Sequence, residues 1–391
     1  MEDAPFGTRD ESEAEIFRTQ TSDLGIVPDR VSPPVEGYFR IPAIWVGDEP
    51  TSSSVNFLNP TIHHYCAIKK RLNCGILVYV QRDGTFLFDF SKWLPAPIVL
   101  IPGYRISDPS KPHRPLPAHS KAEDLAQSFA VLRAQVMNAH QACLTTSEFQ
   151  VKRRGAAMGF PVNAWNTIKS LKWNAQHPYY DDTEDIHALA RNVLNNKDHI
   201  SRQHPLQRRS IELEVIEHSL ALLDHLLKDD DVVLVQIVEA AYLAACRNQE
   251  KRFGEAIVVG WGVCEQLIIA AWNKMLDERQ LHNIETFGMP KHRREKLNGR
   301  DYSASVMVEM LEVNGQLDRE LYRKLEIARK ARNNWVHQMR APKESESDIC
   351  ILAAVQLLKL VKSIYLSLQA SGRGGVPQWP IWMWESKSKH S

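Results

Sequence analysis

The chain has 391 residues, of which 43% are hydrophobic and 24% are charged, and its formal net charge is +1 at pH 7. This length predicts two or three domains, and the composition excludes an intrinsically disordered or fibrous protein. A net charge near zero excludes a global electrostatic field that attracts nucleic acid, so any nucleic-acid site has to be a local patch.

The cysteines and the apolar stretches predict a cytoplasmic protein that does not associate with membranes. No two of the six cysteines are spaced as a C-x-x-C pair, which favours reduced thiols over a disulfide framework or a zinc site. The acidic start of the chain does not resemble a signal peptide. Residues 256–272 form the longest apolar stretch, but Glu265 and Gln266 interrupt it, so we interpret it as a core helix.

The N-terminal region predicts a flexible arm followed by a small β-rich module. Residues 1–34 are acidic and polar, which is typical of a flexible arm. In residues 35–118, strand-like segments at 76–80 and 85–90 flank Asp83-Gly84, a strong hairpin signal. Further strands are expected at 38–41 and 43–46, and a proline-rich loop ends the module.

From residue 119 onward the pattern becomes helical. Residues 119–205 form a middle region, with helices expected at 123–144, 163–173 and 185–194. Residues 206–372 form the clearest helical domain, with helices expected at 211–227, 231–246, 253–281, 303–313, 318–339 and from a cap at Ser345 to Gly372. We therefore predict an α+β protein, in which a β-rich module and a helical middle region precede an all-α bundle.

An aromatic tail, residues 373–391, follows the predicted bundle. Three tryptophans lie within residues 379–384. Such a run is rarely left in water, so we expect it to dock on the fold or on a second subunit.

The segment Arg332-Asn333-Asn334-Trp335-Val336-His337 supplies a cation, an amide and an imidazole within six residues. In a helix at 318–339, Arg332 falls on the apolar stripe of Leu321, Leu325, Ala328, Trp335 and Met339. A buried guanidinium is costly unless it is paired or meets an anion, so Arg332 is anomalous. Asn333 and His337 share another face, while Arg332 and His337 diverge by about 140°.

This segment resembles the R-[polar]-x3-H signature of the HEPN ribonucleases. The stretch 325–337 is similar to the ApeA-like branch in particular, and the helix 262–268 is similar to that family's first core helix. The resemblance covers about residues 210–370. It implies a helical, dimeric, metal-independent endoribonuclease whose site lies at the dimer interface.

The resemblance also assigns roles to residues. It implies that Arg332 and His337 are catalytic and that Asn333 orients them. RNA would be cleaved by attack of the ribose 2′-OH. This chemistry needs two proton-transfer groups, an acid and a base, and the motif of one chain supplies only one imidazole. ApeA-like proteins carry a different N-terminal module, so by analogy the chain is a bacterial toxin or anti-phage effector. A trigger protein is then a candidate partner of the N-terminal half.

Several neighbouring residues have both a functional and a structural interpretation. Glu265 either holds a cation such as Arg332 or lies at a helix flank. Basic residues that either contact phosphate or are simply solvated are Lys291, Arg293, Arg294, Lys296, Arg329, Lys330 and Arg340. The sequence has no residue spacing typical of a metal site and no cofactor-binding motif, so neither a metal ion nor a cofactor is expected.

Two other functions fit the same sequence. The first is a non-catalytic HEPN-type module that binds RNA, a nucleotide or a partner protein. The second is a helical scaffold whose tryptophan-rich tail recruits a partner.

Overall fold

The computed structural model describes most of the chain between residues 35 and 368. The described residues are 35–40, 44–47, 66–82, 84–90, 93, 118–152, 158–163, 167–169, 209–228, 231–282, 291–297 and 303–368. The predicted arm at residues 1–34, the helix at 185–194 and the aromatic tail lie outside them.

The chain divides into two compact units. The first, called the sheet unit, comprises residues 1–147 and 159–236, and the second, the helical unit, comprises residues 148–158 and 237–391. The sequence predicted that residues 206–236 belong to the helical domain at 206–372. They are instead part of the sheet unit.

A five-stranded antiparallel sheet forms the framework of the sheet unit. The strands follow the order β3-β4-β5-β1-β6. Their bounds are β1 Val35–Phe39, β3 Cys66–Arg71, β4 Leu77–Gln81, β5 Thr85–Asp89 and β6 Ile168–Lys169. The predicted hairpin is confirmed, since β4 and β5 pair on either side of Gly84, whose φ is 88°. A positive φ at this turn explains the glycine.

Two short strands pair outside this sheet. β2 (Ile44–Val46) runs parallel to β7 (Arg209–Ile211). Strands β3, β6 and β7 were not expected from the sequence. The helix predicted at 163–173 is wrong at Ile168–Lys169, where β6 pairs with β1. Pairing with a distant strand outweighed the local helical spacing there.

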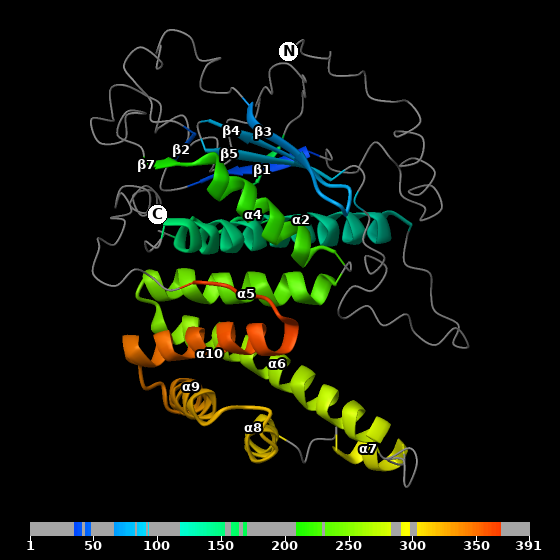
Figure 1. Cartoon of the computed structure of the whole chain (residues 1–391), viewed down its shortest axis with the longest axis vertical. Helices are drawn as coiled ribbons and strands as arrows, with labels where there is room; N and C mark the ends of the chain where they lie inside the picture. Colours follow the sequence, from blue (N-terminus) through cyan, green and yellow to red (C-terminus); the bar gives the residue numbers. More distant parts are fainter. Residues whose placement is uncertain are drawn as a thin grey trace. The chain divides into compact units, whose positions relative to one another are not determined.

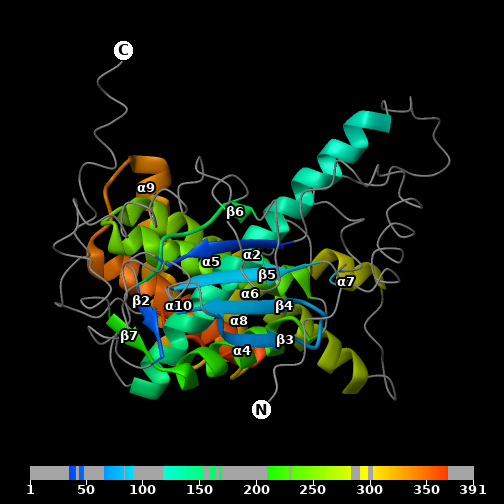
Figure 2. The same cartoon turned by 90° about the horizontal axis from the view of Figure 1, so that it is seen from above.

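Two helices cover one face of the sheet, as Figures 1 and 2 show. They are α2 (Ala118–Lys152), longer than the predicted helix at 123–144, and α4 (Leu213–Leu226). The Tyr38 hydroxyl on β1 lies 2.8 Å from Nδ1 of His140 on α2, and Nε2 of His140 lies 3.3 Å from Oγ of Ser219 on α4. All three residues are fully buried, so hydrogen bonds satisfy polar groups inside this core.

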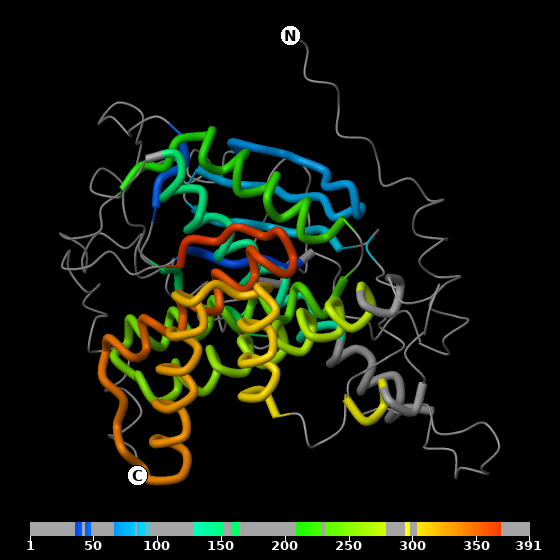
Figure 3. Tube along the Cα trace, turned by 60° about the horizontal axis from the view of Figure 1, so that its bottom comes forward, coloured from blue at the N-terminus to red at the C-terminus, as the bar shows by residue number. Residues whose placement is uncertain are grey.

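The helical unit is built from most of α5 and from α6 to α10, and the path of the chain through them can be followed in Figure 3. Their bounds are α5 Val232–Gln249, α6 Phe253–His282, α7 Lys291–Leu297, α8 Ala304–Val313, α9 Arg319–Gln338 and α10 Glu344–Lys362. Helices α6, α9 and α10 pack against one another. The α+β fold class, with a helical C-terminal part, is confirmed.

The last helix differs from its prediction at both ends. Lys343, not Ser345, is the N-cap, and the side chain of Glu346 accepts from its backbone N–H at 2.7 Å. The helix ends at Lys362, followed by the C-cap Ser363 with a φ of 56°, and not at Gly372. Beyond it Ile364, Leu366 and Leu368 are buried at every second position. Burial at every second residue is typical of an extended backbone, so the helix has ended before this segment.

Helix α6 is the described helix that is long and apolar enough to span a membrane. The segment Phe253–Glu278 passes that test by length and composition, and half of its most apolar window is buried inside the fold. The same test is passed by core helices of soluble proteins. Its packing against α9 and α10 agrees with the core helix that was expected.

Candidate functional site

The motif helix α9 has well-defined ends. The carboxylate of Asp318 accepts from the backbone N–H of Leu321 at 2.7 Å and caps its start. Met339 ends it with a φ of 53°, and its N–H donates to the carbonyl of Trp335 at 3.0 Å. The last two turns therefore carry Arg332, Asn333 and His337, as the spacing predicts.

The buried stripe of α9 is shorter than expected. Leu321, Leu325, Ala328 and Ala331 are buried. Met339, predicted on this stripe, is 78% exposed because the helix ends one residue earlier and the left-handed turn carries it away from the core.

Arg332 is partly buried, and its guanidinium contacts an amide instead of a carboxylate. Its Nη1 donates to Oδ1 of Asn333 at 3.0 Å. Within the described parts of the chain, Glu265 forms no ion pair with it. Glu265 is half-buried on α6, more than two helical turns from Gly254, which contacts α9. The guanidinium therefore has donors left for an anion.

His337 is exposed in the last turn of α9, four residues after Asn333. Among the described residues it has no hydrogen-bond or ion-pair partner. An imidazole in this position is open to solvent and can exchange a proton with a bound molecule.

The predicted basic patch is partly neutralised by nearby carboxylates. Nε and Nη2 of Arg329 each donate to Glu326 at 2.9 Å, and these hydrogen bonds lower the pKa of the Glu326 carboxyl. Lys330 lies 3.9 Å from the same carboxylate, and Arg294 pairs with Asp277. Surface pairs of this kind are weak, so phosphate can displace them, but they reduce the positive field.

The other predicted basic residues are solvated or not described. Lys296 and Arg340 lie at or near the surface. Lys291 and Arg293 belong to α7, and their side chains lie outside the described part of the structure. The sequence prediction of phosphate contacts therefore rests mainly on Arg332, Lys296 and Arg340.

A contact that sequence reasoning missed joins the start of α6 to the motif. A Cβ placed on Gly254 would lie less than 3.0 Å from three indole atoms of Trp335, including Nε1 at 2.8 Å. Trp335 lies between Arg332 and His337 in sequence. The signal that could have found it is a glycine inside an otherwise apolar helix.

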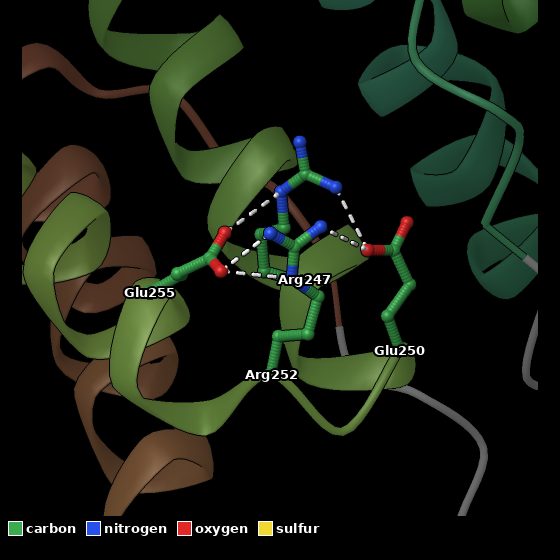
Figure 4. Close-up of polar contacts among 4 residues, drawn as sticks. All are labelled: Arg247, Glu250, Arg252 and Glu255. Atoms are coloured by element: carbon green, nitrogen blue, oxygen red, sulfur yellow. Dashed lines mark hydrogen bonds and ion pairs between the residues drawn. The ribbon is translucent and has the colours of Figure 1, made fainter. Parts of the chain in front are cut away.

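Four charged residues surround the turn that leads into α6, as Figure 4 shows. Arg247 lies 2.7 Å from Glu250 and 3.6 Å from Glu255. Arg252 lies 2.5 Å from Glu255 and 3.6 Å from Glu250. Each arginine thus contacts both carboxylates in a closed ion-pair cluster.

Comparison of the chain with family models, with curated proteins and with solved structures found no match. The candidate site is therefore defined by the residues of α9 and by their contacts.

Proposed function

We propose that the protein is a metal-independent endoribonuclease whose active site contains Arg332, Asn333 and His337. The observation that carries the proposal is the guanidinium of Arg332, partly buried and bonded to Asn333 at 3.0 Å, little more than one turn before the exposed His337. A guanidinium that meets an amide and no carboxylate among the described residues is suited to bind a phosphate. The R-[polar]-x3-H resemblance supports the same assignment.

Each residue then has a separate chemical role. Arg332 binds the phosphate and stabilises the charge that grows on it during attack by the ribose 2′-OH. Asn333 accepts from the guanidinium and fixes its orientation. His337 transfers a proton, either from the 2′-OH or to the departing 5′-oxygen. The second proton-transfer group comes from the His337 of a second chain, so the active form is a homodimer.

The biological setting in this proposal rests on the family resemblance alone. The enzyme is a cytoplasmic toxin or anti-phage effector that acts on RNA. A trigger protein that binds the N-terminal half controls it. The aromatic tail, which lies outside the described residues, is a candidate contact with a partner.

A second candidate function is RNA or nucleotide binding without cleavage. It is supported by the guanidinium of Arg332, which has donors left for an anion and can hold a phosphate without performing chemistry. A binding module predicts salt-sensitive affinity for RNA and intact RNA after long incubation.

The first experiment measures RNA cleavage by the full chain in excess chelator, with His337→Ala as the test variant. We expect a loss of about 10²- to 10⁴-fold, the usual contribution of a general acid or base. His225→Ala is the matched control, since His225 is also an exposed histidine in the last turn of a helix, α4. Equal cleavage by the two variants sinks the assignment.

The chemistry of the product ends gives an independent check. Attack by the 2′-OH leaves 2′,3′-cyclic phosphate or 3′-phosphate ends. Ends carrying a 3′-hydroxyl, formed only with added Mg²⁺, point instead to a metal-dependent nuclease.

A further inference from the structure

Gly254 is the second residue of α6, and its lack of a side chain makes room for Trp335. It is buried and is not one of the described glycines with a positive φ, so its backbone does not require glycine. Glycine in a helix costs about 0.5–1 kcal/mol relative to alanine. The three indole atoms, all under 3.0 Å from the position that an alanine methyl would take, are therefore the physical reason for glycine here.

The contact joins helix ends of opposite polarity. Gly254 lies in the first turn of α6, where the backbone N–H groups make the end positive. Trp335 lies in the last turn of α9, at the negative end of the helix dipole.

The turn before Gly254 is short and hydrogen-bonded. It contains three residues, 250–252, between α5 and α6, and Lys251 has a left-handed φ of 60°. The N–H of Arg252 donates to the carbonyl of Arg247 at 2.9 Å. The ion-pair cluster in Figure 4 spans the same turn and adds to these constraints.

The turn is also tied to the helix that follows the motif. Nδ2 of Asn248, near the end of α5, donates to the carboxylate of Asp348 on α10 at 2.7 Å. The Sγ of Cys350 on α10 contacts the carbonyl of Ile257 on α6 at 3.9 Å. These contacts fix Gly254 relative to α10, which begins soon after α9 ends.

From these contacts we propose that Trp335, seated on Gly254, is a positioning residue for the Arg332 and His337 site. The inference rests on the proposed ribonuclease function. The indole of Trp335, between Arg332 and His337 in sequence, lies against Gly254 on another helix. A shift of Trp335 rotates or tilts the last turns of α9 and moves both functional groups together.

Gly254→Ala tests the proposal, and Gly262→Ala is its matched control. Both glycines lie on α6, but a Cβ at Gly262 meets nothing within 4 Å. We expect Gly254→Ala to lower kcat by about 10- to 100-fold, because displacement by about 1 Å is enough for such a loss. Gly262→Ala should cleave like wild type and unfold at the same or a slightly higher temperature.

A compensating change separates positioning from simple loss of structure. Phenylalanine lacks the second ring of the indole, which includes Cζ2 at 2.6 Å from the added Cβ, so Trp335→Phe gives an alanine methyl more room. We expect the double variant Gly254→Ala, Trp335→Phe to recover most of kcat. The pH profile should stay near wild type throughout, since no titrating group is changed.

Three results distinguish the outcomes. If Gly254→Ala cleaves RNA as fast as Gly262→Ala, the positioning role of Trp335 is overturned. The proposed ribonuclease function is then still tested separately by His337→Ala. A drop in Gly254→Ala that follows its loss of circular dichroism, without rescue by Trp335→Phe, also overturns the positioning role. Wild-type protein that cleaves no RNA overturns both proposals together.

Discussion

His140 is a histidine that the fold keeps neutral. Its ring lies inside the sheet unit, beside Phe86 and Phe88 and near the charge of Arg40. Burial, and to a lesser degree Arg40, lower its pKa to about 3. The Ser219 hydroxyl donates to the carbonyl of Ile216 at 2.7 Å, so its oxygen accepts from Nε2–H, and Nδ1 accepts from Tyr38.

This neutral histidine makes stability depend on pH. The unfolded chain protonates His140 near pH 6.5 and the folded chain only near pH 3, so between these values the unfolded state binds the additional proton. The free energy of unfolding therefore falls as the pH falls from 6.5, by at most about 1.4 kcal/mol per pH unit from this group. Urea unfolding between pH 7 and pH 5 measures it.

His140→Gln should remove this part of the pH dependence. Glutamine does not titrate, and His225→Gln, at an exposed position of the same unit, is the control that should leave the dependence unchanged. If the unfolding free energy of the wild type changes with pH as little as that of His140→Gln, His140 is not a neutral buried histidine.

The sequence was sufficient to locate the candidate site but not its partners. The place of Arg332 and His337 on one helix end follows from local spacing and from the cap at Asp318. The suggested pairing of Glu265 with Arg332 depends on how two distant helices cross, which local spacing does not determine. The Gly254–Trp335 contact was missed for the same reason.

Among the elements, α9 ends in a conformation that its last residue does not favour. Met339 has a φ of 53°, which costs a side-chain-bearing residue about 1 kcal/mol, whereas glycine adopts it readily. Met339 is mostly exposed, so little packing is lost on its removal. We expect Met339→Gly to raise the free energy of unfolding by about 0.5–1 kcal/mol, measured by urea unfolding.

A methionine-to-glycine substitution inside a helix should instead lower the free energy of unfolding. Met310 lies on α8 and is also exposed, so Met310→Gly replaces an equivalent side chain in a helical backbone. We expect a loss of about 1 kcal/mol there. Destabilisation by both variants would show that the left-handed turn at Met339 is not strained.

The elements that sequence reasoning found are those defined by local signals. The hairpin at Gly84 needs only a turn and two flanking strands, and the long helices of the helical unit need only apolar spacing. Strands β6 and β7 have two and three residues and pair with segments far away in the chain, so their own sequences carry almost no signal. The end of α10 was predicted too late because buried residues continue beyond it at a period of two.

The number of histidines in the candidate site predicts that the proposed ribonuclease acts as a dimer. Each α9 offers one exposed imidazole, whereas cleavage by acid and base uses two proton-transfer groups. A symmetric pair of chains supplies the second, and twofold dimers are the commonest oligomers.

Mixing wild type with His337→Ala at constant total protein tests the shared site. After subunit exchange, cleavage should fall with the square of the wild-type fraction, because only dimers with two intact chains carry both imidazoles. Light scattering checks the mass under the same conditions. A linear fall, or full activity in a monomer, would end the dimer proposal.

The parallel pairing of β2 with β7 has a consequence for the order in which the chain folds during synthesis. Ile44 cannot meet Arg209 until the chain has been synthesised and released as far as residue 209. Long-range pairing is slow, and an unpaired strand edge invites aggregation while it waits. The sheet unit therefore completes its fold only after synthesis has passed β7, well after its first strands have been made.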